Sequence, residues 1–158
     1  MLKRVWAACL AAAFLIPAAS AAAPVLTQKD QCASCEMWIT KYPGPKGAVQ
    51  LTDGTVLKYC SARGAACGWT KALKAGKAKS LWMHDASAND WKKPADDAMV
   101  DVKDAWFVYG SKMKAVMGPS LAPFADKAKA EAFQKEHGGK IYRLNELTAE
   151  VLGCGAKY

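Results

Sequence analysis

Two thiols and one thioether lie within six residues of each other in the segment Gln-Cys-Ala-Ser-Cys-Glu-Met, residues 31–37. Thiolate and thioether sulfur are soft ligands, which prefer Cu(I) to harder divalent ions. A thioether has no proton to lose, so Met37 can bind a metal at any pH. Cys32, Cys35 and Met37 are therefore candidate ligands of a metal site, and Cu(I) is the expected metal.

The spacing of these residues allows their sulfur atoms to converge. If residues 35–37 are extended, Cys35 and Met37 point to the same side, because side chains alternate along a strand. Cys32 lies one tight turn earlier. Met117 is the candidate ligand from a distant part of the chain, since it opens a Met-Gly-Pro turn in the second half of an internal repeat described below.

Further ligands are possible among the other methionines and the two histidines. Met113 lies close to Met117 in the sequence. Met83 and His84 are neighbours in a predicted strand, so they should face opposite sides and only one of them should point inward. His137 precedes two glycines at a predicted helix end, where a cation suits the helix dipole, so a structural role is expected for it.

The same residues also allow structural or redox interpretations. Met37 and Met117 could be ordinary core side chains. Cys32 and Cys35 could form a structural disulfide in an oxidising compartment. They could also form the redox pair of a periplasmic thiol-disulfide protein, which would place them at a helix N-terminus. The residues that follow, 38–40, instead predict a strand, and no βαβ unit comes after them.

Three further cysteines, Cys60, Cys67 and Cys154, lie outside this segment. With Cys32 and Cys35 they make an odd number of thiols in the mature chain, so they cannot all pair within it. We expect one structural disulfide among Cys60, Cys67 and Cys154. The sequence does not indicate which pair forms it.

The N-terminus has the pattern of a signal peptide, predicted over residues 1–22. Lys3 and Arg4 are followed by an apolar stretch over 5–17, too short to span a bilayer, and by small residues suited to cleavage. Cys9 lies inside the apolar stretch, and no lipobox Cys stands at the cleavage point. The mature chain is therefore expected in the periplasm, soluble rather than lipid-anchored.

The chain carries a modest excess of positive charge. Its formal net charge of +8 falls to +6 when Lys3 and Arg4 leave with the signal peptide, and the lysines are spread along the sequence. An exported protein without stacking aromatic motifs is not expected to bind nucleic acid. Docking to an acidic partner remains open.

An internal repeat predicts the fold, because a shift of 64 residues aligns glycine and apolar positions of the two halves. Each half is predicted as strand, strand, helix, strand, the first with a hairpin at Asp53-Gly54. The expected fold class is α+β, with two similar ββαβ halves and antiparallel sheets. The mature chain, residues 23–158, is expected to be one domain, with repeats at about 48–86 and 100–146. The predicted elements are strands at 48–51, 55–60 and 79–85, a helix at 62–74, strands at 105–109, 121–124 and 140–144, and a helix from 126 to 137.

Five short motifs occur in order along the chain: Cys-Ala-Ser-Cys-Glu-Met (32–37), Lys-Tyr-Pro (41–43), Met-Gly-Pro-Ser-Leu-Ala-Pro-Phe (117–124), Ala-Phe (132–133) and His-Gly-Gly (137–139). Together they resemble the NosL family, the accessory proteins of nitrous oxide reductase. The resemblance covers nearly the whole mature chain. It implies a periplasmic or membrane-tethered Cu(I) chaperone of two ββαβ halves, with a fold similar to that of organomercurial lyase.

The resemblance also implies a carrier rather than an enzyme. The acceptor it implies is nitrous oxide reductase during assembly of its copper centres, with a membrane ABC transporter complex as a second partner. We expect the chain itself to be a monomer. Glu36 stands where the family usually has Gly, and the lipidation Cys of most members is absent. A carbon–mercury lyase is a weaker alternative, because fold alone does not carry function.

Overall fold

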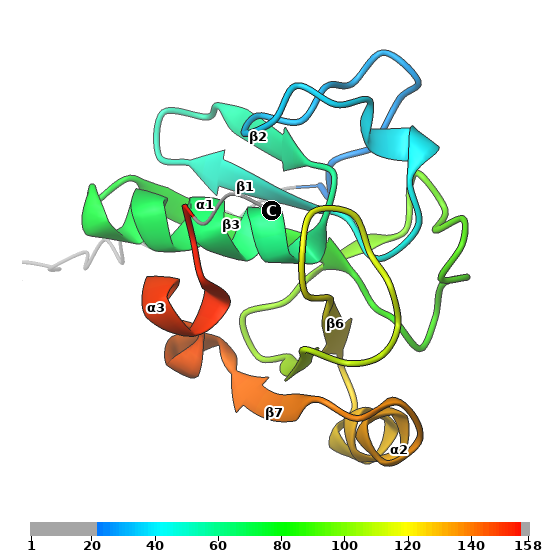
Figure 1. The fold of residues 1–158 in the computed structure, drawn as a ribbon. Helices are drawn as coiled ribbons and strands as arrows, with labels where there is room; N and C mark the ends of the chain where they lie inside the picture. The colour runs from blue at the N-terminus through cyan, green and yellow to red at the C-terminus, as the bar shows by residue number, and fades with distance from the viewer. Residues whose placement is uncertain (1–21, 156–158) are drawn as a thin grey trace, which may run out of the picture.

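The computed structural model describes residues 22–155, so the predicted signal peptide lies, except for Ala22, outside the described residues. Two antiparallel sheets, each with a helix, form the body of the chain (Figure 1). The elements are η1 (Ile39–Lys41), β1 (Gly47–Leu51), β2 (Val56–Tyr59), α1 (Ala62–Lys74), β3 (Ala78–His84), β4 (Met99–Asp101), β5 (Trp106–Tyr109), β6 (Leu121–Phe124), α2 (Lys127–His137), β7 (Lys140–Arg143), η2 (Leu144–Glu146) and α3 (Ala149–Leu152).

The first half forms a sheet with strand order β2-β1-β3-β4. The β1–β2 hairpin turns at Asp53-Gly54, where Gly54 has φ +89° and the Asp53 carboxylate accepts the Thr55 N–H at 2.9 Å. The next helix, α1, begins at Ser61, whose hydroxyl accepts the Gly64 N–H at 3.0 Å and satisfies an otherwise unpaired donor. Buried alanines of α1 pack this helix against β1 and β3.

The second half repeats this arrangement with the strand order β6-β5-β7. Asp126 caps α2 by accepting the Ala128 N–H at 2.7 Å, and Gly138 ends the helix with φ +72°. The α+β class and the two ββαβ halves are confirmed. The halves differ in one connection, because β1 and β2 are joined by a tight turn whereas residues 110–120 form a long loop between β5 and β6.

Met83 and His84 are both fully buried, so the prediction that only one of them points inward is wrong. The reason is that β3 is an inner strand with both of its faces covered. Met83 approaches Gly47 of the neighbouring strand β1. His84 donates from Nε2 to the Ala95 carbonyl in the loop after β3, at 2.9 Å.

The larger of two hydrophobic clusters extends across both halves. It contains side chains of the first sheet, such as Val49 and Leu81, and of the second, such as Phe107 and Leu121. Within residues 22–155, none of the helices has the length and apolar character needed to cross a membrane.

Arg63 joins three separate segments at one point of the fold. Its guanidinium donates to the carbonyls of Leu152 at 2.8 Å, Gly153 at 2.7 Å and Met117 at 3.1 Å. This side chain is buried in the first turn of α1. The 110–120 loop and the C-terminal segment are therefore both fixed to the start of α1, next to the end of β2.

Candidate metal centre

The sulfur atoms of Cys32, Cys35 and Cys60 all lie within 4.8 Å of one another. Cys35 Sγ and Cys60 Sγ are 3.6 Å apart. All three are free thiols; Cys32 and Cys60 are buried and Cys35 is half-buried. We call these three residues the thiol cluster. A group of this size with one partly exposed member can enclose a soft ion while leaving a path to solvent.

The segment that carries Cys32 and Cys35 is a tight loop. Cys32 donates its N–H to the Met37 carbonyl at 2.9 Å, and its own carbonyl accepts the Glu36 N–H at 2.9 Å. Glu36 has φ +60°, in the left-handed region that favours glycine. Residues 35–37 are therefore not extended, and the predicted alternation of Cys35 and Met37 along a strand is wrong.

The residues after this loop also differ from the prediction. A strand was predicted at residues 38–40, but Ile39–Lys41 forms the short helix η1. Trp38 makes only an isolated β-bridge, to Gln31. Ile39 is fully buried, and its N–H donates to the Asp30 carbonyl at 3.1 Å. Burial of the Ile39 side chain and the hydrogen bond from the Ile39 N–H to Asp30 therefore determine the local structure. The apolar residues that suggested a strand here are instead part of a short helix and its flank.

Strand β2 brings Cys60 to this loop. Ala33 donates its N–H to the Lys58 carbonyl at 2.9 Å, and the Lys58 ammonium pairs with the Asp30 carboxylate at 2.8 Å. The loop is thereby docked along β2. Cys60 follows Lys58 by two positions, on the same side of the extended chain, and so it meets Cys32 and Cys35.

The thiols of Cys32 and Cys60 have opposite pKa shifts. Interaction with the Cys60 thiol, followed by a hydrogen bond to Ser34, lowers the pKa of Cys32. The hydrogen bond of the Cys60 thiol to Cys32, together with burial and the negative charge on Cys32, raises the pKa of Cys60. A cluster of this kind holds one thiolate stabilised by a neighbouring thiol, and the remaining protons leave when a cation binds.

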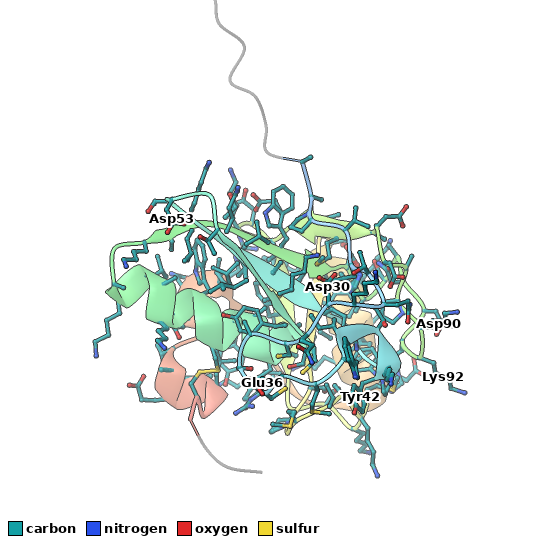
Figure 2. All side chains as sticks on the ribbon, turned by 90° about the horizontal axis from the view of Figure 1, so that it is seen from above. Asp30, Glu36, Tyr42, Asp53, Asp90 and Lys92 are labelled. Carbon is teal, nitrogen blue, oxygen red and sulfur yellow. A yellow bond between two sulfur atoms is a disulfide. The ribbon has the colours of Figure 1, made fainter. Side chains whose placement is uncertain are left out.

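Figure 2 shows Glu36 and Tyr42 at the same end of the molecule, away from Asp53 at the tip of the β1–β2 hairpin. The thiol cluster belongs to this end, because Cys35 directly precedes Glu36. The 110–120 loop lies at this end too: a Cβ on Gly44 would come within 2.8 Å of Ala115. Loop residues from both halves of the fold therefore lie at the end of the molecule that carries the cluster.

The methionines predicted as ligands occupy two different environments. Met37 is half-buried, and its backbone is tied to Cys32 by the hydrogen bond described above. Met117 is 41% exposed and has φ +65°, with its carbonyl held by Arg63. Neither is a fully buried core side chain. Met113, in the same loop as Met117, is half-buried.

The histidines are occupied by other contacts. His84 accepts the Lys46 N–H at Nδ1 and donates from Nε2 to Ala95, so both ring nitrogens are used and burial lowers its pKa. His137, at the end of α2, packs against the Phe133 ring with centroids 4.6 Å apart. These contacts give both residues structural roles.

The one disulfide within residues 22–155 joins Cys67 of α1 to Cys154. One bridge among Cys60, Cys67 and Cys154 was predicted, and it is found. Cys32 and Cys35 are not bridged to each other. They also lie in a turn that precedes η1 rather than at the N-terminus of a helix, which disfavours the predicted alternative of a thiol-disulfide redox protein.

The sequence profile of the NosL family matches residues 23–152. The chain belongs to the NosL family. A crystal structure of the copper chaperone NosL from Shewanella denitrificans is similar to this chain with a TM-score of 0.76 and 34% sequence identity, and the match covers 81% of this chain and 96% of that one. The family resemblance and the fold class predicted from the sequence are therefore confirmed.

Two curated NosL proteins extend the comparison, both named copper-binding lipoproteins. The protein from Stutzerimonas stutzeri is 36% identical over 123 residues, which cover 78% of this chain and 64% of that protein. The protein from Achromobacter cycloclastes is 26% identical over 118 residues, covering 72% and 61%. The chain thus spans less than two thirds of each relative. Their lipoprotein names differ from our expectation of a chain without a lipid anchor.

Cys60 was not predicted as a metal ligand; it was predicted as one of three candidates for a structural disulfide. Its distance in sequence from Cys35 gave no sign of contact. The signal that could have found it is the predicted hairpin, since the strand ending at residue 60 lies next to the strand that follows the Cys32–Cys35 loop. In this NosL protein the hairpin positions β2, and the hydrogen bond from Ala33 to Lys58 docks the Cys32–Cys35 loop along it.

Proposed function

We propose that this chain is a periplasmic Cu(I) metallochaperone and that the thiol cluster holds the copper. The observation that carries the proposal is the convergence of three free thiols, two of them buried. The copper-binding names of the NosL relatives support the metal. Soft sulfur ligands suit Cu(I), whereas a structural Zn(II) site usually needs four ligands. Within residues 22–155, no fourth Cys, His, Asp or Glu joins the thiol cluster.

The proposed ligands are Cys32, Cys35 and Cys60, with thioether sulfur supplied by Met37 and Met117. Met37 is held to Cys32 through the backbone. Met117 is exposed on a loop that is fixed next to the end of β2. His84 is left out of the proposed set, because both of its ring nitrogens are already hydrogen-bonded.

The exposure of the cluster supports a carrier rather than an enzyme. Cys32 and Cys60 are 2% and 3% exposed, so they hold the ion from the protein side, whereas Cys35 is half-buried and can be approached by ligands of an acceptor. Copper then passes by ligand exchange: an incoming sulfur or nitrogen binds as Cys35 leaves, and free Cu(I) is never released. No bond of a substrate has to be broken.

We further propose nitrous oxide reductase as the acceptor and a membrane ABC transporter complex as a second partner, with the chain acting as a monomer. The support is the family membership and the motifs that carry it. We also propose that the mature chain is periplasmic, because residues 1–22 have the pattern of a signal peptide. Cell fractionation tests this point, and recovery of the chain in the cytoplasm would contradict it.

Anaerobic titration of the reduced protein with Cu(I), against a chromogenic Cu(I) chelator, tests the proposed function. We expect one Cu(I) per chain and retention of Zn(II) far weaker than that of Cu(I). Cys35→Ser and Cys60→Ser should each weaken Cu(I) binding by at least about tenfold, because each removes a soft anionic ligand.

The matched control is the double variant Cys67→Ser, Cys154→Ser, which also removes two sulfur atoms but leaves the cluster intact. It should bind one Cu(I) with the affinity of the parent. A stoichiometry well below one in the parent, or equal retention of Zn(II), would contradict the proposed function. A Cys60→Ser variant that binds as tightly as the parent would remove Cys60 from the ligand set.

A further inference from the structure

Lys46 is a buried cation without an acidic partner. It is 2% exposed, a position that lysine almost never occupies unless its charge is paired. None of the ion pairs found within residues 22–155 includes it. Its ammonium donates to two backbone carbonyls, those of Tyr42 and Pro43. Carbonyl oxygens orient the charge but do not neutralise it.

The pairing of β1 with β2 places Lys46 beside the thiol cluster. Gly47 lies opposite Tyr59 in this antiparallel pair, so the next positions outward are Lys46 and Cys60. The contact continues beyond them, because the Pro45 carbonyl accepts the Ala62 N–H at 2.7 Å. Opposite residues in such a pair share a face, with Cβ atoms about 5 Å apart.

His84 fixes the backbone of Lys46 from the other side. Lys46 donates its N–H to His84 Nδ1 at 3.0 Å, and its carbonyl accepts the His84 N–H at 3.1 Å. The imidazole is held in turn by the Ala95 carbonyl. The backbone from which the Lys46 side chain extends is therefore held in place next to the cluster.

The charge of a loaded cluster explains why a cation is useful at this point. Three thiolates and one Cu(I) carry a net charge of 2−, and buried charge is unfavourable unless it is compensated. An anionic cluster and the buried ammonium thus stabilise each other's charged form.

We propose that Lys46 is a positioning residue whose ammonium compensates the charge of the copper-loaded thiol cluster, so that Cys32, Cys35 and Cys60 can all bind Cu(I) as thiolates. This inference rests on the proposed function. It assigns a role in metal binding to a side chain that is not itself a ligand.

The test compares Lys46→Gln with the parent in the anaerobic Cu(I) titration and by X-ray absorption. Glutamine is neutral, and its amide can still donate to the two carbonyls that hold Lys46. We expect the Cu(I) affinity to fall between about a hundredfold and about a thousandfold, the loss expected when one charge contact of about 4–6 Å is removed at an effective dielectric constant near 20. The number of sulfur scatterers around copper should fall as well, because one thiol keeps its proton.

Two variants separate charge from structure. Lys46→Arg keeps the cation and should recover most of the affinity and the full sulfur count. Lys79→Met removes an exposed charge from the neighbouring strand β3 and should leave the affinity within about twofold of the parent, because surface charges are screened. Circular dichroism confirms that each variant is folded, and Lys46→Met serves as the neutral variant if Lys46→Gln does not fold.

The outcomes distinguish this inference from the function on which it rests. If the parent binds no Cu(I), both are overturned. If the parent binds one Cu(I) and the folded neutral variant binds it equally well with the same sulfur count, only the role of Lys46 is overturned. A loss of affinity that Lys46→Arg fails to restore would show a steric effect and would also overturn it.

Discussion

Removing the Cys67–Cys154 disulfide should lower the free energy of unfolding strongly while leaving copper binding unchanged. The bridge ties the middle of α1 to the segment after α3 and joins residues 87 apart in sequence. It therefore restricts the unfolded chain over β3, the whole second half and the C-terminal helix. The perturbation is the double variant Cys67→Ala, Cys154→Ala.

The magnitude follows from the length of the closed loop. Chain entropy gives about 4.6 kcal/mol at 25 °C for a loop joining residues 87 apart. The folded state should change little, because the C-terminal segment keeps its hydrogen bonds from Arg63 and from Tyr109, whose hydroxyl donates to the Leu152 carbonyl at 3.0 Å. We therefore expect a loss of about 3–5 kcal/mol, or about 15 °C in Tm for a domain of this size.

Urea unfolding followed by circular dichroism measures this loss. The m-value should rise in the variant, because an unfolded chain without the bridge exposes more surface, so free energies rather than midpoints have to be compared. Wild-type protein treated with a phosphine reductant is the second sample and should match the variant. A loss below about 1 kcal/mol would refute the entropy argument, and a folded variant that no longer binds one Cu(I) would place these cysteines in the metal site.

Three further predictions concern single residues. Glu36→Gly should raise the free energy of unfolding by about 1 kcal/mol in urea titrations, because φ is +60° there; a loss of stability would contradict the strain. Burial holds the pKa of His84 in the folded protein below its usual 6.5, so the unfolded chain binds more protons at acidic pH. Stability should therefore be lost as the pH falls below about 6.5. A Tm that stays constant from pH 7 to pH 5 would contradict this prediction. Met117→Leu should change the unfolding free energy by less than about 0.5 kcal/mol, since Met117 is 41% exposed, yet lower Cu(I) affinity and remove one sulfur scatterer; unchanged affinity and sulfur count in the folded variant would make Met117 a surface residue only.

The elements that local signals control could be predicted from the sequence almost to the residue. The helix at 62–74 and the strand at 121–124 are found with the predicted bounds. Asp126 caps α2 and Gly138 ends it, as predicted. In each case the deciding contact is made by residues a few positions away, so a short window of sequence contains it.

The parts of the site that depend on distant contacts could not be predicted in this way. Cys60 joins the thiol cluster only through the docking of the Cys32–Cys35 loop along β2. The choice of Cys67 and Cys154 as the bridged pair depends on α3 returning to α1, which no local signal encodes. Glu36 stands where the family usually has Gly, and its backbone has φ +60°. The tight loop that requires this conformation is visible only in the fold.

The thiol cluster contains residues from two segments that are close only in the folded chain, namely the loop before β1 and the end of β2. In an unfolded chain these thiols are separate and offer at most the Cys32–Cys35 pair. Copper loading is then coupled to folding, so a bound ion stabilises the native state by mass action. Under the proposed function, the β1–β2 hairpin has to form before all three thiols can bind one ion.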